Sequence, residues 1–147
     1  MFGEHFPLPD GQGPYDDGSI IIVVATDAPL LPHQLKRLTR RAGMGLARNG
    51  SVAHNGSGDI FIAFTTAGGV LDATDRLLTH RSVPNEAIDP LFTATVQATE
   101  EAIVNALVAA RDMTGDQGHT VTAIPHDELM EVLKRYGRLE PSVKKRP

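Results

Sequence analysis

A glycine and a serine stand at the entrance to an unbroken aliphatic run in this sequence. Gly18 and Ser19 come directly before residues 20–25, all of which are Ile, Val or Ala. A serine at the mouth of a buried strand has two interpretations. It is an ordinary turn residue, or it is a site of autocatalytic cleavage. In the second case Ser19 becomes a new N-terminus, and its own α-amine serves as the base that activates its hydroxyl. The residues alone leave both interpretations open.

A second serine and a carboxylate lie in a glycine-rich turn before another apolar run. Ser57 and Asp59 flank Gly58 and follow an Asn-Gly pair at 55–56. The neighbouring glycines leave little side-chain bulk around Ser57, so its hydroxyl and the Asp59 carboxylate could point into one site. The alternative is an ordinary loop with a solvated Asp59.

Other familiar catalytic and binding motifs are missing from the sequence. It has no cysteine, which excludes disulfides, thiol catalysis and zinc-thiolate sites. No pair of histidines has metal-ligand spacing, and no Ser-His-Asp triad can be assembled. The glycine-rich segments match neither a phosphate-binding loop nor a dinucleotide-binding motif. We therefore expect no metal and no cofactor. The six histidines of the sequence are His5, His33, His54, His80, His119 and His126.

Length and composition predict one globular domain. The chain has 147 residues, of which 41% are apolar. We expect a flexible Pro/Gly-rich lead over residues 1–18 and a single domain over residues 19–147. The net charge of −4 argues against nucleic acid as a partner. No apolar run reaches membrane-spanning length and the first residues hold no signal-peptide core, so we expect a cytoplasmic protein with no membrane partner.

Two strands and a helix are predicted to position the serines. The aliphatic run at 20–25 predicts a strand buried on both faces. A helix is predicted from Pro32, which the first helical turn tolerates, to Gly43 or Gly45. The apolar run at 60–66 predicts a second central strand beside the first. Their relative orientation is left open, with antiparallel pairing as one possibility.

The predicted helix from Pro32 carries basic residues on the face opposite its apolar positions. Such a cluster is typical of a solvated helix face, and the alternative is a site for an anion or a carboxylate. The cluster consists of Lys36, Arg37, Arg40 and Arg41.

The remainder of the chain predicts mostly helix. Residues 67–88 form a long excursion with a short helical turn at 72–78. A helix is expected from Asp89 to about residue 112, with its alanine-rich face packed closely, and it ends before Gly115. A short strand at 120–124 precedes a last helix, which opens at Pro125 and ends at Gly137.

Three segments of the sequence together resemble one enzyme family. Residues 17–30, 32–38 and 55–61 are similar to the DmpA family of N-terminal-nucleophile peptidases. This family includes L-aminopeptidase/D-amidase-esterases and β-peptidyl aminopeptidases. The resemblance covers nearly the whole chain after Asp16 and corresponds to the smaller, C-terminal β-subunit. It implies an α/β (α+β) fold that is part of an αββα sandwich of the DmpA/ornithine-acetyltransferase-like type.

The resemblance also implies a mechanism and an activity. The precursor would cleave itself between Gly18 and Ser19, and the freed α-amine, with an ordinary pKa near 8, would take the hydroxyl proton of Ser19. Ser57 and Asp59 match the second serine and the acidic residue of the family, which hydrogen-bond and polarise the amine and the hydroxyl. The implied enzyme is an aminopeptidase or amidase without a cofactor, acting on the N-terminal residue of short peptides, amides or esters.

One departure from the family affects the expected partners. Family members carry a larger α-subunit ahead of the nucleophile, whereas only eighteen residues precede Ser19 here. We therefore expect the chain to need an α-subunit-type chain or to form a homo-oligomer. The alternative function is that of a non-catalytic oligomerising or binding module.

Overall fold

The structure is a computed structural model, and it describes residues 18–67, 80–118 and 120–139. Within these residues the chain divides into two units, 18–104 and 105–139. The lead at 1–17 and the helical turn predicted at 72–78 lie outside the described residues.

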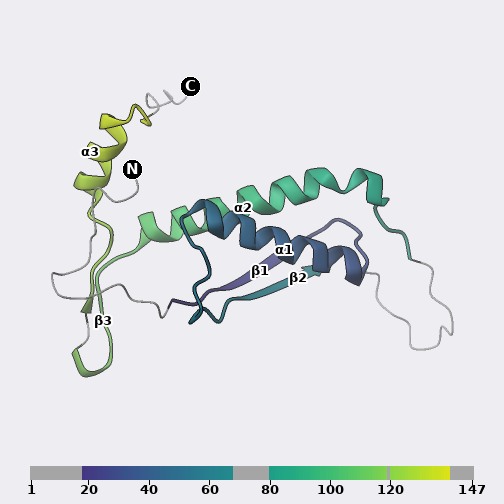
Figure 1. Cartoon of the computed structure of the whole chain (residues 1–147), viewed down its shortest axis with the longest axis horizontal. Helices are drawn as coiled ribbons and strands as arrows, with labels where there is room; N and C mark the ends of the chain where they lie inside the picture. Colours follow the sequence, from purple (N-terminus) through teal and green to yellow (C-terminus); the bar gives the residue numbers. More distant parts are fainter. Residues whose placement is uncertain (1–17, 68–79, 119, 140–147) are drawn as a thin grey trace. The chain divides into compact units, whose positions relative to one another are not determined.

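The first unit is built on two parallel strands. Strand β1 (Ile21–Thr26) pairs with β2 (Ile60–Thr65), and the register runs from Ile21 opposite Ile60 to Thr26 opposite Thr65. Both predicted strands are confirmed, and the orientation that the sequence left open is parallel. Parallel strands need a long crossover, and helix α1 (Pro32–Arg48) supplies it. Figure 1 shows α1 lying along the strand pair.

The two faces of this sheet differ in burial. Val24 and Ala63 pack on the hydrophobic core and are half-buried. The large side chains on the opposite face, which we call the outer face, are 45–66% exposed. The prediction of strands buried on both faces is therefore wrong for the described residues, because α1 covers one face only. The outer face consists of Ile21, Val23, Ile60, Ile62 and Phe64.

Helix α1 extends past both glycines that were predicted to end it. It continues to Arg48, and the positive φ of 100° that closes it belongs to Gly50. Gly43 and Gly45 both lie inside the helix, and the space around them differs. A Cβ on Gly43 would lie 3.7 Å from the Phe61 ring, and one on Gly45 would lie 2.6 Å from the Thr99 Cβ. Close packing therefore explains Gly45, whereas a Cβ at Gly43 would make only an ordinary van der Waals contact.

The core of the first unit lies between α1 and helix α2 (Asp89–Ala109). Leu38 and Ile88 are its most deeply buried large side chains. The short 3-10 turn η1 (Asn85–Ala87) leads into α2. The prediction that the alanine-rich face of α2 packs closely is wrong, since Ala94 and Ala98 are exposed. The buried positions of α2 are Phe92, Thr95 and Thr99.

Part of the basic cluster on α1 packs against an aromatic ring. The guanidinium carbons of Arg37 and Arg41 lie 4.9 Å and 3.8 Å from the centre of the Phe92 ring. Arg37 also donates a hydrogen bond to the Asn85 side chain at 2.8 Å. These two arginines stack on α2 and are half-buried, whereas Lys36 and Arg40 are exposed, as on a solvated face.

The second unit is a short hairpin followed by a helix. Strands β3 (Met113–Thr114) and β4 (Thr120–Val121) pair antiparallel around the 3-10 turn η2 (Asp116–Gly118). Helix α3 (His126–Arg135) follows, and Gly137, at a φ of 62°, closes it as predicted. None of the helices in the described ranges is long and apolar enough to cross a membrane.

Candidate functional site

Ser19 and the Ser57–Asp59 turn lie at the same edge of the parallel sheet. Because Ile21 is opposite Ile60, Ser19 comes opposite Gly58 two residues earlier. The backbone N–H of Gly58 donates a hydrogen bond to Ser19 Oγ at 2.9 Å. Ser19 itself is exposed, so its hydroxyl oxygen is both accessible and fixed by a backbone donor. Parallel pairing is what joins two segments 39 positions apart.

Asp59 holds the backbone immediately after Ser19. Its Oδ1 atom accepts the N–H of Ile20 at 3.1 Å, and the Ile60 N–H donates to the Ile20 carbonyl at 2.9 Å. The Asp59 side chain is half-buried. Its carboxylate therefore lies one residue from the nitrogen of Ser19, and its second oxygen remains for another donor.

Ser57 is placed by the turn that precedes β2. Its N–H donates to the His54 carbonyl at 2.8 Å, which closes the turn through residues 55–56. The side chain is half-buried and borders two hollows of the surface. The smaller, about 180 Å³, also includes Gly18 and His54, and the larger, about 360 Å³, includes Asp59. The four predicted site residues thus gather at one place.

Gly58 belongs to the candidate site, and sequence reasoning missed it. A Cβ built on Gly58 would lie 3.3 Å from Ser19 Oγ, so a larger residue would crowd the serine oxygen. The glycine allows its N–H to approach at 2.9 Å. The sequence signal was the Gly-Ser-Gly triplet itself, but a backbone donor cannot be identified from residue type.

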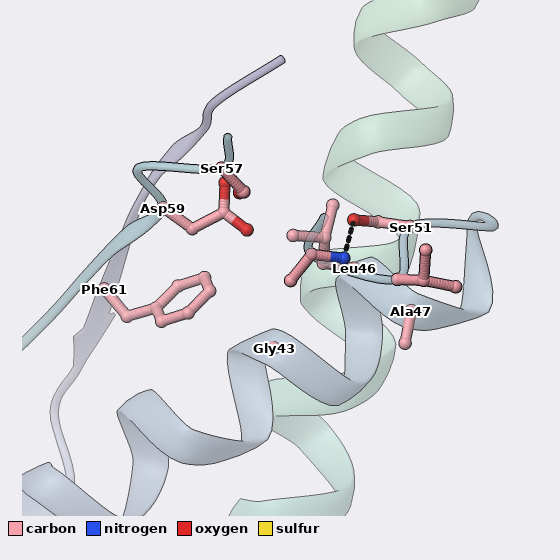
Figure 2. Close-up of a pocket in the computed structure, with 9 residues that line it drawn as sticks. Gly43, Leu46, Ala47, Ser51, Ser57, Asp59 and Phe61 are labelled. Carbon is pink, nitrogen blue, oxygen red and sulfur yellow. Dashed lines mark hydrogen bonds between the residues drawn. The ribbon is translucent and has the colours of Figure 1, made fainter. Parts of the chain in front are cut away.

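Figure 2 shows the larger pocket, with Asp59 directed into it and toward Ser57. The ring of Phe61 and the backbone of Gly43 form its floor, and Leu46 and Ala47 of α1 form one wall. On the far side the Ala53 N–H donates to Ser51 Oγ at 3.4 Å. The pocket therefore combines an apolar interior with a polar rim made of two serines and one carboxylate.

This geometry suits nucleophilic chemistry at Ser19. A backbone N–H aimed at a hydroxyl oxygen stabilises negative charge that develops on that oxygen. A carboxylate near the Ser19 nitrogen stabilises a positive charge there, once that nitrogen is a free amine. Serine activation by a neighbouring amine needs a base within reach of the hydroxyl, and both of these interactions favour that arrangement.

Comparison with known proteins identifies the family. The model of peptidase family S58 matches residues 3–121. The chain is 52% identical over 124 residues to beta-peptidyl aminopeptidase BapA from Sphingosinicella microcystinivorans, covering 84% of this chain and 31% of that protein.

Two solved structures give the same result. The L-aminopeptidase D-Ala-esterase/amidase of Ochrobactrum anthropi, described as a variant of the Ntn hydrolase fold, matches with a TM-score of 0.75 and 48% identity over 83% of this chain and 35% of that one. The Burkholderia sp. beta-aminopeptidase matches with a TM-score of 0.74 and 42% identity over 85% of this chain and 36% of that one.

The chain spans about a third of the length of these relatives. Its mixed α/β fold is that of the matching region in the solved structures, which confirms the predicted fold class. The family that the sequence resembles is confirmed as well. The chain belongs to peptidase family S58.

Proposed function

We propose that this chain is the nucleophile-bearing part, equivalent to a β-subunit, of a serine aminopeptidase or amidase. It removes the N-terminal residue from short peptides, amides or esters after cleavage at Gly18–Ser19. The observation that carries the proposal is the 2.9 Å hydrogen bond from the Gly58 N–H to Ser19 Oγ. Family membership and the names of the relatives, which are aminopeptidases, support it.

The first step is self-cleavage. Ser19 Oγ attacks the carbonyl carbon of Gly18, the Gly18–Ser19 peptide bond breaks, and its nitrogen takes up the hydroxyl proton. Water then hydrolyses the resulting ester. The products are a segment that ends at the Gly18 carboxylate and a chain that begins with the free amine of Ser19. The Gly58 N–H stabilises Ser19 Oγ as its proton leaves, before the oxygen bonds to the carbonyl carbon.

The second stage uses the new amine as the base. An α-amine with a pKa near 8 takes the Ser19 hydroxyl proton at neutral pH. Asp59, which accepts the N–H of the next residue, Ile20, at 3.1 Å, is the carboxylate that stabilises the ammonium that results. Ser57 is the neighbouring hydroxyl that orients the amine.

Peptide hydrolysis then follows as acyl transfer. Ser19 Oγ attacks the carbonyl carbon of the substrate's first residue, and the ammonium returns its proton to the departing amine. Water cleaves the acyl ester, which restores the Ser19 hydroxyl and releases the residue as a carboxylic acid. No redox change and no cofactor are needed for this sequence.

The outer face supports the proposal that a partner is required. Five large apolar side chains on one sheet face are 45–66% exposed, and such a patch is typical of a buried interface. We propose that an α-subunit-type chain, or a second copy of this chain, covers it. The same observation favours the second candidate function, that of a non-catalytic oligomerising or binding module.

Intact-mass analysis tests the first step. Wild-type protein, expressed alone and with the N-terminal part of a relative, is expected to lose residues 1–18, and Ser19→Ala is expected to keep them. Processed protein is then assayed with amino-acid nitroanilides. Processing without turnover in the presence of the partner would leave the binding module as the function. A full-length mass under both conditions would refute the cleavage proposal.

A further inference from the structure

The larger pocket beside Asp59 has the form of a side-chain subsite. Its volume is about 360 Å³, and it lies between the second half of α1 and the start of β2. Phe61 provides an aromatic floor, and Leu46, Ala47 and Val52 provide aliphatic walls. These walls would bury the apolar part of a ligand, while its polar part would stay at the rim beside Ser57 and Asp59.

Gly43 sets the depth of this pocket. A Cβ at Gly43 would lie 3.7 Å from two atoms of the Phe61 ring, which is ordinary van der Waals contact. An added side chain would therefore fit beside the ring and occupy the floor of the pocket. This glycine thus differs from Gly45, where a Cβ would collide with α2.

The charge of the Asp59 carboxylate limits which ligands the pocket can accept. Asp59 is the one ionisable side chain among the residues that line the pocket. Its carboxylate disfavours an acidic group brought against it, because like charges at close range in a partly buried site repel. The apolar walls, rather than the carboxylate, favour an apolar group, and the carboxylate disfavours an acidic one.

We propose that this pocket receives the apolar side chain of the substrate's N-terminal residue, and that Gly43 limits the size of the side chain accepted. The assignment to substrate rests on the proposed aminopeptidase function. Binding of small apolar amino-acid amides to the pocket does not depend on that function, and this binding can be measured without turnover.

Three amides with the same head group form a matched set of probes. L-Leucinamide and L-alaninamide differ by three side-chain carbons, and isoglutamine places an acidic side chain on the same amide. Each buried methylene changes affinity by about fourfold. In wild-type protein we expect leucinamide to bind about tenfold or more tightly than alaninamide. We expect isoglutamine to be the weakest of the three.

The readout is the backbone amide NMR signals of Gly43, Ala47 and Phe61 during titration with each amide. Gly43→Ala should reduce the preference for leucinamide, and Gly43→Val should remove it while alaninamide still binds. A dispersed amide spectrum shows that each variant is folded. Gly43→Ala keeps the test valid if the valine variant does not fold.

Two outcomes would overturn the subsite. One is leucinamide shifting none of these three signals in wild-type protein, and the other is equal leucinamide affinity in wild type and in a folded Gly43→Val. A failure of the proposed function looks different. In that case leucinamide still binds and discriminates at Gly43, but processed protein with its partner releases no nitroaniline from leucine nitroanilide.

Discussion

Gly43 and Gly45 make a matched pair for testing how α1 is packed. They are two residues apart in one helix, yet their surroundings are different. A Cβ at Gly45 would lie 2.6 Å from both the Thr99 Cβ and the Val96 carbonyl oxygen, whereas one at Gly43 meets the Phe61 ring at 3.7 Å. We predict that Gly45→Ala destabilises the protein and that Gly43→Ala does not.

The expected magnitudes follow from two opposing terms. Replacing glycine by alanine inside a helix contributes about 1 kcal/mol of stability at either position. Overpacking a tight contact costs about 1–3 kcal/mol, and the Gly45 contact belongs at the upper end, because a helix backbone oxygen cannot move aside. Gly45→Ala should therefore lose about 2 kcal/mol, and Gly43→Ala should gain up to about 1 kcal/mol.

Urea unfolding followed by far-UV circular dichroism measures this difference. The two variants should differ by about 3 kcal/mol in unfolding free energy, with similar slopes against urea concentration. Both substitutions reduce the entropy of the unfolded chain equally, so this effect cancels between them. Equal stabilities, or a more stable Gly45→Ala, would refute the α1–α2 packing described here.

Four further predictions concern the site and its support. Ser19→Ala should leave the intact mass at its full-length value while the circular dichroism spectrum is unchanged; loss of residues 1–18 in this variant would rule out Ser19 as the nucleophile. Asp59→Asn keeps an oxygen acceptor for the backbone but removes the charge, so nitroanilide turnover of processed protein should fall about 100-fold without loss of stability; unaltered turnover would contradict the role given to its charge. Gln34→Leu leaves two partly buried backbone groups without their 2.7–2.9 Å partners, and urea unfolding should show a loss of about 2 kcal/mol. Ile62→Lys on the outer face should change the stability of the isolated chain by less than about 0.5 kcal/mol but block association with its partner in size-exclusion chromatography; unchanged association would exclude this face as the interface.

The sequence predicted the elements around the site better than their arrangement. Continuous apolar runs identified both strands, and Pro32 identified the start of α1. The orientation of the strands could not be predicted, because the aliphatic pattern of one strand is the same for either direction of its neighbour. The end of α1 was mispredicted because glycine was interpreted as a stop signal, whereas Gly45 is required by its close contact with Thr99.

The sequence predicted the side chains of the candidate site but not the backbone groups that contact them. Ser19 and Asp59 were identified from residue type, position and family resemblance. The structure places them around one backbone junction, with Asp59 on the Ile20 N–H and Ser19 on the Gly58 N–H. These backbone donors depend on strand pairing, which no single-residue signal encodes.

Strand register links the site to the packing of α1. A one-residue shift of β2 against β1 would turn Asp59 and Phe61 to the outer face. A two-residue shift would keep both faces but displace the Gly58 N–H by about 6.6 Å along the strand, which breaks its hydrogen bond to Ser19 Oγ. The ring of Phe61 seated against Gly43 opposes both shifts. A bulky residue at Gly43 therefore acts in two ways: it fills the pocket, and it puts strain on the register that holds Gly58 against the serine oxygen. Weaker leucinamide binding with the Ser19 and Gly58 amide signals unchanged would indicate pocket filling alone, whereas shifts at those two amides would indicate a change of register.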